Sequence, residues 1–209
     1  MNQKQHVIVF GASGGTGKQF VKQALEAGYS VTAFVRNPAK LDGLTHDHLK
    51  ITVGDATDVQ AVAEAIAGHD VVVSCLGGKG LGKSTVLTTM TDAIVQGMKQ
   101  HGLDRILYVA SAGVHKEVPG FFGSLVQFML RNVLVDHQGA IERMKDAGLS
   151  YTIARPLQLT DGPFTGVYRT AEQGVPRGGS RISRADVAHF LLERLKEEGT
   201  KSESVGLAY

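Results

Sequence analysis

The chain has a single cysteine and no tryptophan among its 209 residues. One thiol, Cys75, cannot form a disulfide within the chain. This excludes a disulfide-stapled secreted domain and favours a reducing, cytoplasmic compartment. Cys75 lies in the apolar run VVVSCLG, so we expect it to be a small core residue.

Long hydrophobic runs and a strong charge of one sign are also missing. No apolar stretch reaches the ~18 residues that a membrane helix needs, and the first glycines come too early for a signal-peptide core. The net charge is +2, and the 22 Lys and Arg residues are scattered along the chain. We therefore expect no membrane association and no nucleic-acid partner. His46 and His48 have no evident third ligand, so no metal site is expected.

Short apolar runs alternate with longer helical patterns along the whole chain. The runs lack period-2 alternation, which predicts strands buried on both sides of a parallel sheet. We expect a single domain over residues 1–209 with a doubly wound α/β (Rossmann-like) fold in three layers. The predicted strands are His6–Phe10, Ser30–Val35, Leu49–Val53, Asp70–Leu76, Arg105–Ala110 and Ser150–Ala154. The predicted helices are Gly15–Ala27, Asp58–Ala67, Ser84–His101, Asp136–Ala147 and Ser183–Glu198, with a helical turn over Pro38–Leu41.

The stretch Gly113–Val135 departs from this alternation. It carries Phe121, Phe122, Phe128 and Met129 and is more apolar than a surface loop should be. Two interpretations are open: a packed crossover helix, or a substrate lid or pocket wall.

The sequence GASGGTGK, residues 11–18, lies between the first predicted strand and the first predicted helix. In such a loop the first glycine allows a tight turn, the second a close approach of a pyrophosphate, and the third close helix packing. The N–H groups at the helix N-terminus then meet the phosphate charge. We expect cofactor contacts from Gly11, Ser13, Gly14, Gly15, Thr16 and Gly17. The G-x-x-G-x-x-G spacing resembles the short-chain dehydrogenase/reductase superfamily.

The end of the second predicted strand indicates which dinucleotide binds. An NAD site places Asp or Glu there for the ribose 2′-OH, but this chain has Arg36. A guanidinium pairs with a 2′-phosphate and stacks on adenine, and Lys40 is placed to assist. This favours NADP(H) over NAD(H); the alternative is a surface arginine at a strand end.

Other candidate residues follow later predicted strands, at the carboxyl ends where this fold binds ligands. Asp55 and Ala56 follow the third strand, and Leu76 and Gly77 the fourth. The Tyr-x-x-x-Lys pair that donates a proton in most short-chain dehydrogenases is absent. Ala, Ala, Arg and Glu stand four residues after the first four tyrosines, and Tyr209 ends the chain.

Several segments together sharpen the resemblance. GASGGTGK, AFVRNPAKL, GDATD, VSCLGG, ARPLQLTDGPFTGVY and RISRADVAHFLL resemble the biliverdin IXβ reductase/flavin reductase family over nearly the whole chain. The resemblance implies hydride transfer from NADPH to a flavin or bilin in an open, shallow pocket. Position by position, it implies site roles for Gly11, Thr16, Arg36, Asp55, Leu76 and Ser111.

The same resemblance suggests the reacting end. The Ser111 hydroxyl would face the nicotinamide and the substrate, unless it is only a polar strand cap. His137 matches a family histidine near the pocket and is a candidate proton relay near neutral pH; the alternative is an ordinary surface histidine. Leu157 stands where the family's reductases carry a second histidine. Backbone groups of Pro156 and Leu157 are expected near the nicotinamide carboxamide.

These observations predict an NADPH-dependent oxidoreductase that reduces a flat acceptor such as a flavin, quinone or bilin. Such an acceptor takes a hydride at an electron-poor centre, and water can supply the proton. The alternative is a non-catalytic NADP(H)-binding redox sensor, which the missing Tyr-x-x-x-Lys pair favours. A nucleotide-sugar epimerase is disfavoured because it needs that pair and a larger substrate domain. We expect a small-molecule partner and a monomer or weak homodimer.

Overall fold

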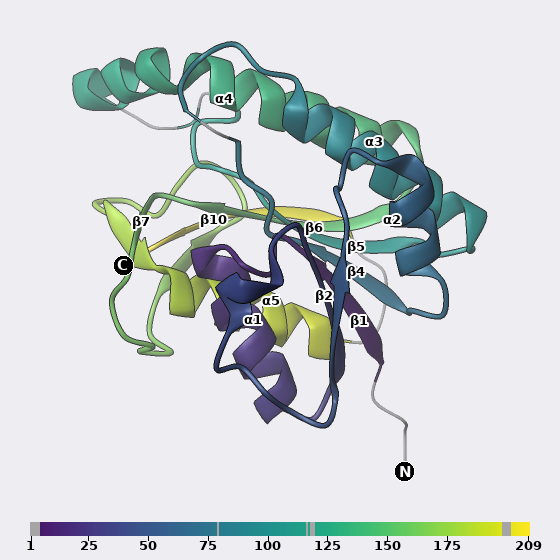
Figure 1. Cartoon of the computed structure of the whole chain (residues 1–209). Helices are drawn as coiled ribbons and strands as arrows, with labels where there is room; N and C mark the ends of the chain where they lie inside the picture. Colours follow the sequence, from purple (N-terminus) through teal and green to yellow (C-terminus); the bar gives the residue numbers. More distant parts are fainter. Residues whose placement is uncertain (1–4, 79, 116, 118–119, 198–201) are drawn as a thin grey trace.

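The structure, a computed structural model, describes residues 5–78, 80–115, 117, 120–197 and 202–209. An eight-stranded sheet crosses it in the order β3-β2-β1-β4-β5-β6-β10-β8 (Figure 1). Neighbouring strands pair in parallel except β10 with β8. The strands are β1 His6–Phe10, β2 Ser30–Val35, β3 Leu49–Val53, β4 Val71–Ser74, β5 Arg105–Val109, β6 Ser150–Pro156, β8 Arg169–Ala171 and β10 Glu203–Ala208. A separate parallel pair joins β7 Gln158–Thr160 to β9 Arg181–Ser183.

Helices cover both faces of the sheet (Figure 1). On one face α1 packs against α5, and on the other α3 lies between α2 and α4. Each face buries its own apolar cluster against the strands. The predicted three-layer, doubly wound architecture is therefore confirmed. The helices are α1 Gly15–Glu26, α2 Val59–Ile66, α3 Val86–Gln100, α4 Gly120–Asp146 and α5 Arg184–Lys196, with a 3₁₀ turn η1 over Pro38–Leu41.

Two helix starts follow from the local sequence. The Asp58 carboxylate accepts hydrogen bonds from the backbone N–H groups of Gln60 and Ala61, at 3.0 and 3.1 Å, and caps α2. The Ser183 hydroxyl accepts from the N–H of Asp186 at 3.0 Å and caps α5. The reciprocal bond of a capping box is not formed, because the Ser183 N–H donates to the Tyr209 hydroxyl instead.

The C-terminal part of the fold differs from the prediction. Strands β7, β8, β9 and β10 were not expected, and β10 inserts between β6 and β8. Strands β7, β8 and β9 span three residues each, too few to form a recognisable run. Strand β10 spans six residues, but Glu203, Ser204 and Gly206 interrupt its apolar pattern. Their pairing partners lie far away in sequence, which a local pattern does not reveal.

Helix α4 contains most of the ambiguous stretch Gly113–Val135. The helix begins at Gly120, not at Asp136 as predicted. The side chain of Leu134 is buried, whereas Leu125, Phe128 and Met129 are exposed apolar residues. Within the stretch Gly113–Val135, the packed-helix interpretation therefore fits only the end where Leu130 and Leu134 contact the core. The substrate lid or pocket wall stays a hypothesis for the exposed part. The described part of the chain contains no helix long and apolar enough to span a membrane.

Candidate functional site

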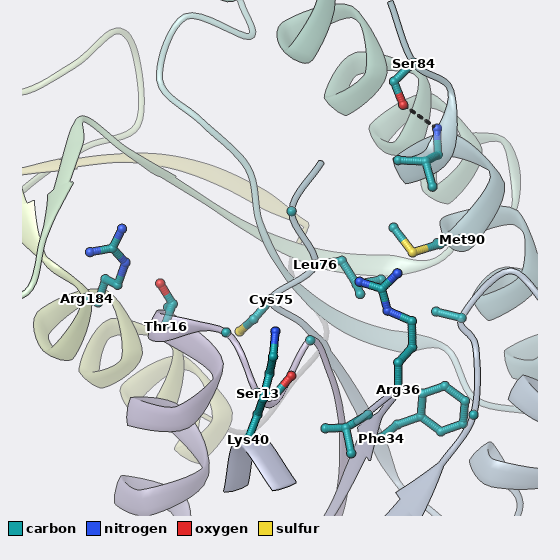
Figure 2. A pocket seen from close by; sticks show the side chains of 18 residues that line it. Ser13, Thr16, Phe34, Arg36, Lys40, Cys75, Leu76, Ser84, Met90 and Arg184 are labelled. Atoms are coloured by element: carbon teal, nitrogen blue, oxygen red, sulfur yellow. Dashed lines mark hydrogen bonds between the residues drawn. The ribbon is translucent and has the colours of Figure 1, made fainter. Parts of the chain in front are cut away.

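A cleft of about 610 Å³ opens at the carboxyl ends of β1, β2, β3 and β4 (Figure 2). The chain runs outward from β1 to β2 and β3, and then returns to β4 on the other side of β1. The cleft lies at this reversal, which is the ligand position of open α/β sheets. Ten expected cofactor residues line it: Gly11, Ser13, Gly14, Gly15, Thr16, Arg36, Lys40, Ala56, Leu76 and Gly77. Eight others were not predicted: Phe34, Val35, Gly54, Cys75, Ser84, Val86, Met90 and Arg184.

The loop between β1 and α1 allows no side chains at two glycines. Gly11 has a φ of +74°, and a Cβ there would lie 2.5 Å from the Cys75 carbonyl oxygen. A Cβ at Gly17 would lie 2.2 Å from the carbonyl oxygen of Gly11. Gly17 does not line the cleft; it brings α1 against the loop. The loop backbone is therefore held in a tight turn at the helix N-terminus.

This loop suits a phosphate group. Gly14 precedes α1 and supplies no side-chain cap to its first turn. The first N–H groups of the helix are thus available to an anion at the positive end of the helix dipole. The glycine cradle and the donor set both fit the pyrophosphate of a dinucleotide.

Positive charge lies at two sides of this loop. Arg36 and Lys40 approach from the end of β2 and from η1, and Arg184 approaches from the start of α5 (Figure 2). Among the described residues that line the cleft, none is Asp or Glu. The lining is therefore suited to an anionic ligand.

Asp55 does not line the cleft, although Gly54 and Ala56 on either side of it do. Its Oδ1 accepts hydrogen bonds from the N–H and the hydroxyl of Thr57, at 2.9 and 2.8 Å. These bonds hold the pKa of the Asp55 carboxyl below its usual value. In this structure Asp55 shapes the turn that carries its neighbours to the cleft.

Ser111 and Pro156 come together at the carboxyl ends of β5 and β6. The N–H of Ala112 donates to the Pro156 carbonyl at 2.9 Å, and the Ser111 hydroxyl donates to the Ala112 carbonyl at 3.1 Å. The N–H of Leu157 donates to the Leu207 carbonyl of β10. This N–H therefore has a partner within the sheet, and the contact of Pro156 and Leu157 with a nicotinamide carboxamide stays a prediction. None of the three expected residues lines the cleft.

His137 is neither a surface residue nor part of the cleft lining. It is 6% exposed, and its Nδ1 shares a 2.9 Å hydrogen bond with the Tyr108 hydroxyl. Burial lowers the pKa of His137 to about 4 and raises the pKa of Tyr108. The imidazole is therefore neutral at pH 7. This does not fit the expected relay, which needs a pKa near neutrality.

Cys75 is a half-buried residue of the cleft wall that packs against the core, so the core prediction is correct only in part. Burial raises the pKa of its thiol to about 12, which makes it unreactive at neutral pH. Across the described ranges, no group of three or more His, Cys, Asp or Glu residues is placed to hold a metal ion.

Sequence reasoning missed Arg184 because it belongs to a distant segment. Helix α5 packs against α1, and this contact brings Arg184 beside the glycine loop. Phe34, Val86 and Met90 carry no motif and are ordinary apolar residues in sequence. No local signal distinguishes them from other core positions.

Residues 11–198 match the NAD(P)H-binding family. The chain is 28% identical over 257 residues to "Reductase pytE" of Aspergillus terreus, covering 99% of this chain and 97% of that protein. It superposes on the anaerobillin reductase ChuY of Escherichia coli O157:H7 with a TM-score of 0.80 and 22% identity, covering 96% of each chain. A short-chain dehydrogenase/reductase of Veillonella parvula in complex with NADP gives a TM-score of 0.81 at 18% identity, covering 98% of this chain and 94% of that one.

Proposed function

Because this chain belongs to the NAD(P)H-binding family, we propose that it is a reductase that binds NADPH and reduces a flat acceptor such as a flavin, quinone or bilin. The observation that carries this proposal is the cleft lining. The glycine loop and two cations from the β2 end share one cleft, and no described lining residue is a carboxylate.

The lining favours NADPH over NADH. A 2′-phosphate is a dianionic group that pairs well with a guanidinium, and Arg36 stands where an NAD site carries its acid. Lys40 adds a second positive charge to the same wall. The adenosine end of the dinucleotide would therefore lie against Arg36 and Lys40, with the pyrophosphate on the loop of Gly11–Gly17.

The choice of a flat acceptor rests on the proton. The chain lacks a Tyr-x-x-x-Lys pair, His137 is neutral and buried, and the Cys75 thiol has a raised pKa. Reduction of a ketone needs a positioned proton donor, whereas an electron-poor flavin or quinone takes a hydride and receives its proton from water. NADPH supplies the hydride when bound. The residues of the chain hold the two reactants in contact and exclude water from one face.

The names of two similar proteins support a reductase: one is a reductase of Aspergillus terreus and one an anaerobillin reductase. Ser111, at the end of β5, would lie at the nicotinamide end. A small-molecule acceptor, a monomer or weak homodimer, and a cytoplasmic location suited to one unpaired thiol belong to the same proposal.

The test starts with fluorescence titration of the purified protein with NADPH and NADH. FMN, menadione and biliverdin are then added separately, and absorbance at the nicotinamide band is followed against matched protein-free reactions. NADPH oxidation above the free-acceptor background supports the proposal. Tight binding with oxidation at background for all three acceptors contradicts it.

A redox sensor is the second candidate. It is favoured by the absence, among the described cleft residues, of a proton donor with a pKa near neutrality. A sensor binds NADPH and NADP⁺ without turnover and changes its contact with a partner. Pull-downs with NADP⁺ or NADPH that recover the same proteins, or none, would argue against it.

A further inference from the structure

We propose that Arg184 and Asp161 form a latch over the glycine loop, in which the Asp161 carboxylate competes with the dinucleotide pyrophosphate for the Arg184 guanidinium. The proposal rests on the proposed dinucleotide binding and adds a clamp from the opposite side of the cleft to Arg36. Arg184 then contributes to both NADPH and NADH binding, and Asp161 opposes both.

Arg184 reaches the glycine loop from α5. It is the first residue of that helix, and α5 packs against α1. A Cβ at Gly15 would lie 2.5 Å from the Arg184 Cδ and 2.8 Å from its Nε. The arginine side chain therefore lies directly on the first residue of α1. Gly15, Thr16 and Arg184 line the same cleft (Figure 2).

This position is where a pyrophosphate would lie. The first-turn N–H groups of α1 bind a phosphate from one side, and the Arg184 guanidinium approaches from another. Arginine makes paired, charge-assisted hydrogen bonds to phosphate oxygens, and its fork geometry suits two oxygens at once. Because the pyrophosphate is common to both dinucleotides, this contact does not discriminate between them.

The present partner of Arg184 is weakly held. The Arg184 Nη1 and the Asp161 Oδ1 are 2.7 Å apart, but the Asp161 side chain is 88% exposed. An ion pair so exposed changes an equilibrium by at most about fivefold. A phosphate that accepts two hydrogen bonds from the guanidinium at a helix N-terminus is the stronger acceptor. The guanidinium therefore exchanges the Asp161 carboxylate for the phosphate.

Asp161 can be altered without loss of its loop. The segment after β7 is anchored further along by Asp186, whose Oδ1 accepts from the N–H groups of Thr165 and Gly166 at 3.0 and 2.9 Å. Asp186 is fully buried. Asp161→Asn therefore removes the competing charge and leaves this anchor in place.

The experiment compares three variants by fluorescence titration with NADPH and with NADH at one ionic strength. Arg184→Ala is expected to weaken both dinucleotides by about tenfold or more. Asp161→Asn is expected to tighten both by about two- to fivefold, because it frees the guanidinium. Arg181→Ala removes the same charge three residues earlier, at an exposed site outside the cleft lining, and should leave both affinities unchanged.

Several outcomes overturn the latch. If Arg184→Ala binds both dinucleotides with wild-type affinity, Arg184 does not contact the pyrophosphate. If the variant weakens NADPH binding alone, Arg184 contacts the 2′-phosphate instead. Weaker binding by Asp161→Asn shows that the ion pair supports the site and does not compete with it. If the wild-type protein binds neither dinucleotide, the proposed function fails together with the latch. If it binds both without turnover, only the reductase proposal fails, because the latch is measured by binding.

Discussion

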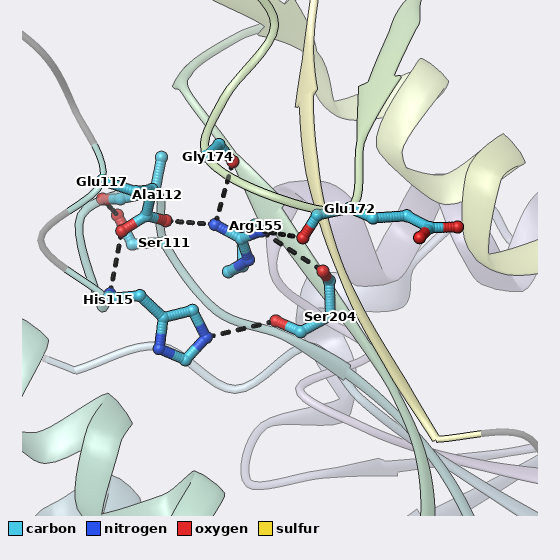
Figure 3. A network of polar contacts seen from close by, with 8 residues as sticks. All are labelled: Ser111, Ala112, His115, Glu117, Arg155, Glu172, Gly174 and Ser204. Atoms are coloured by element: carbon cyan, nitrogen blue, oxygen red, sulfur yellow. Dashed lines mark hydrogen bonds and ion pairs between the residues drawn. The ribbon is translucent and has the colours of Figure 1, made fainter.

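The phosphate-loop end of the cleft and the β5–β6 end of the sheet are built in opposite ways. The first is built from one short stretch, Gly11–Gly17, in which Ser13, Gly14 and Gly15 are exposed or half-buried, with the exposed Arg36 and Lys40 soon after in sequence. The second is held by a buried arginine whose hydrogen-bond partners come from distant segments of the chain (Figure 3). Arg155 of β6 is 1% exposed and is paired with Glu117 from the loop after β5.

The Arg155 network connects β6 with β10 and with two loops. Its guanidinium donates to the carbonyls of Glu172, Gly174 and Ser204, at 3.3, 3.2 and 3.2 Å. The N–H of His115 donates to the Glu117 carboxylate at 2.8 Å. The loop that follows Ser111 is thereby tied to β6, β10 and the turn after β8 (Figure 3).

The two ends of the sheet serve different purposes: one attracts an anionic ligand, and the other holds the backbone in place. Exposed cations near the phosphate loop contribute attraction to an anionic ligand and can be removed without disturbing the fold. A buried ion pair adds little net stability, but breaking it leaves an uncompensated charge. We therefore expect changes at the first end to alter dinucleotide binding, and changes at the second end to alter stability.

The largest expected effect comes from breaking the buried pair. Glu117→Ala leaves the Arg155 guanidinium buried with only carbonyl partners, and should lower the free energy of unfolding by about 3–5 kcal/mol. Urea unfolding measures this loss. The double variant Glu117→Ala/Arg155→Met should recover much of it, because no charge stays buried. A single-variant loss below about 1 kcal/mol would show that solvent reaches Arg155.

The next effect is a pH dependence of the free energy of unfolding, caused by His137, which is buried against Tyr108 of β5. The pKa of His137 is about 4 in the folded chain against an ordinary 6.5. Below pH 6.5 the unfolded chain takes up a proton that the folded chain does not. The free energy of unfolding should therefore fall as the pH drops from 6.5 to 4, by about 3 kcal/mol from this group, with no further loss below.

His137→Gln is the control for this pH dependence. The variant should flatten the fall in the free energy of unfolding between pH 6.5 and 4, measured by urea unfolding at stepped pH. A residual slope is expected from His69 and His115, whose pKa values burial also lowers. An unchanged slope in His137→Gln would mean that its imidazole is protonated in the folded state.

The smallest of the three effects concerns the exposed end. Arg36→Ala should weaken NADPH by about 1.5–3 kcal/mol through loss of a charge-assisted contact with the 2′-phosphate. NADH affinity and the urea midpoint should stay the same. Isothermal titration calorimetry measures both affinities. Equal weakening of NADPH and NADH would remove the assignment of Arg36 to the 2′-phosphate and blur the contrast between the two ends.

The sequence alone was a good guide to the first half of the fold. The runs at His6–Phe10, Ser30–Val35 and Leu49–Val53 are strands with the predicted bounds, because they are short and rich in β-branched residues. The third run alternates apolar with polar residues and forms an edge strand that is largely exposed, not one buried on both sides. Asp58 caps α2 for a local reason. The glycine loop was predicted from spacing, because a phosphate cradle needs glycine at defined offsets within one turn.

Only the tertiary structure decided the rest. The pairing of Arg155 with Glu117, the insertion of β10 beside β6 and the approach of Arg184 to Gly15 all join residues that are distant in sequence. From the sequence alone a charged residue is expected to be exposed, because its burial depends on partners that only the folded chain brings to it. Local patterns thus determined strands β1 to β6, the caps of α2 and α5 and the phosphate loop, whereas long-range packing decided the C-terminal strands, which charges are buried and which face the cleft.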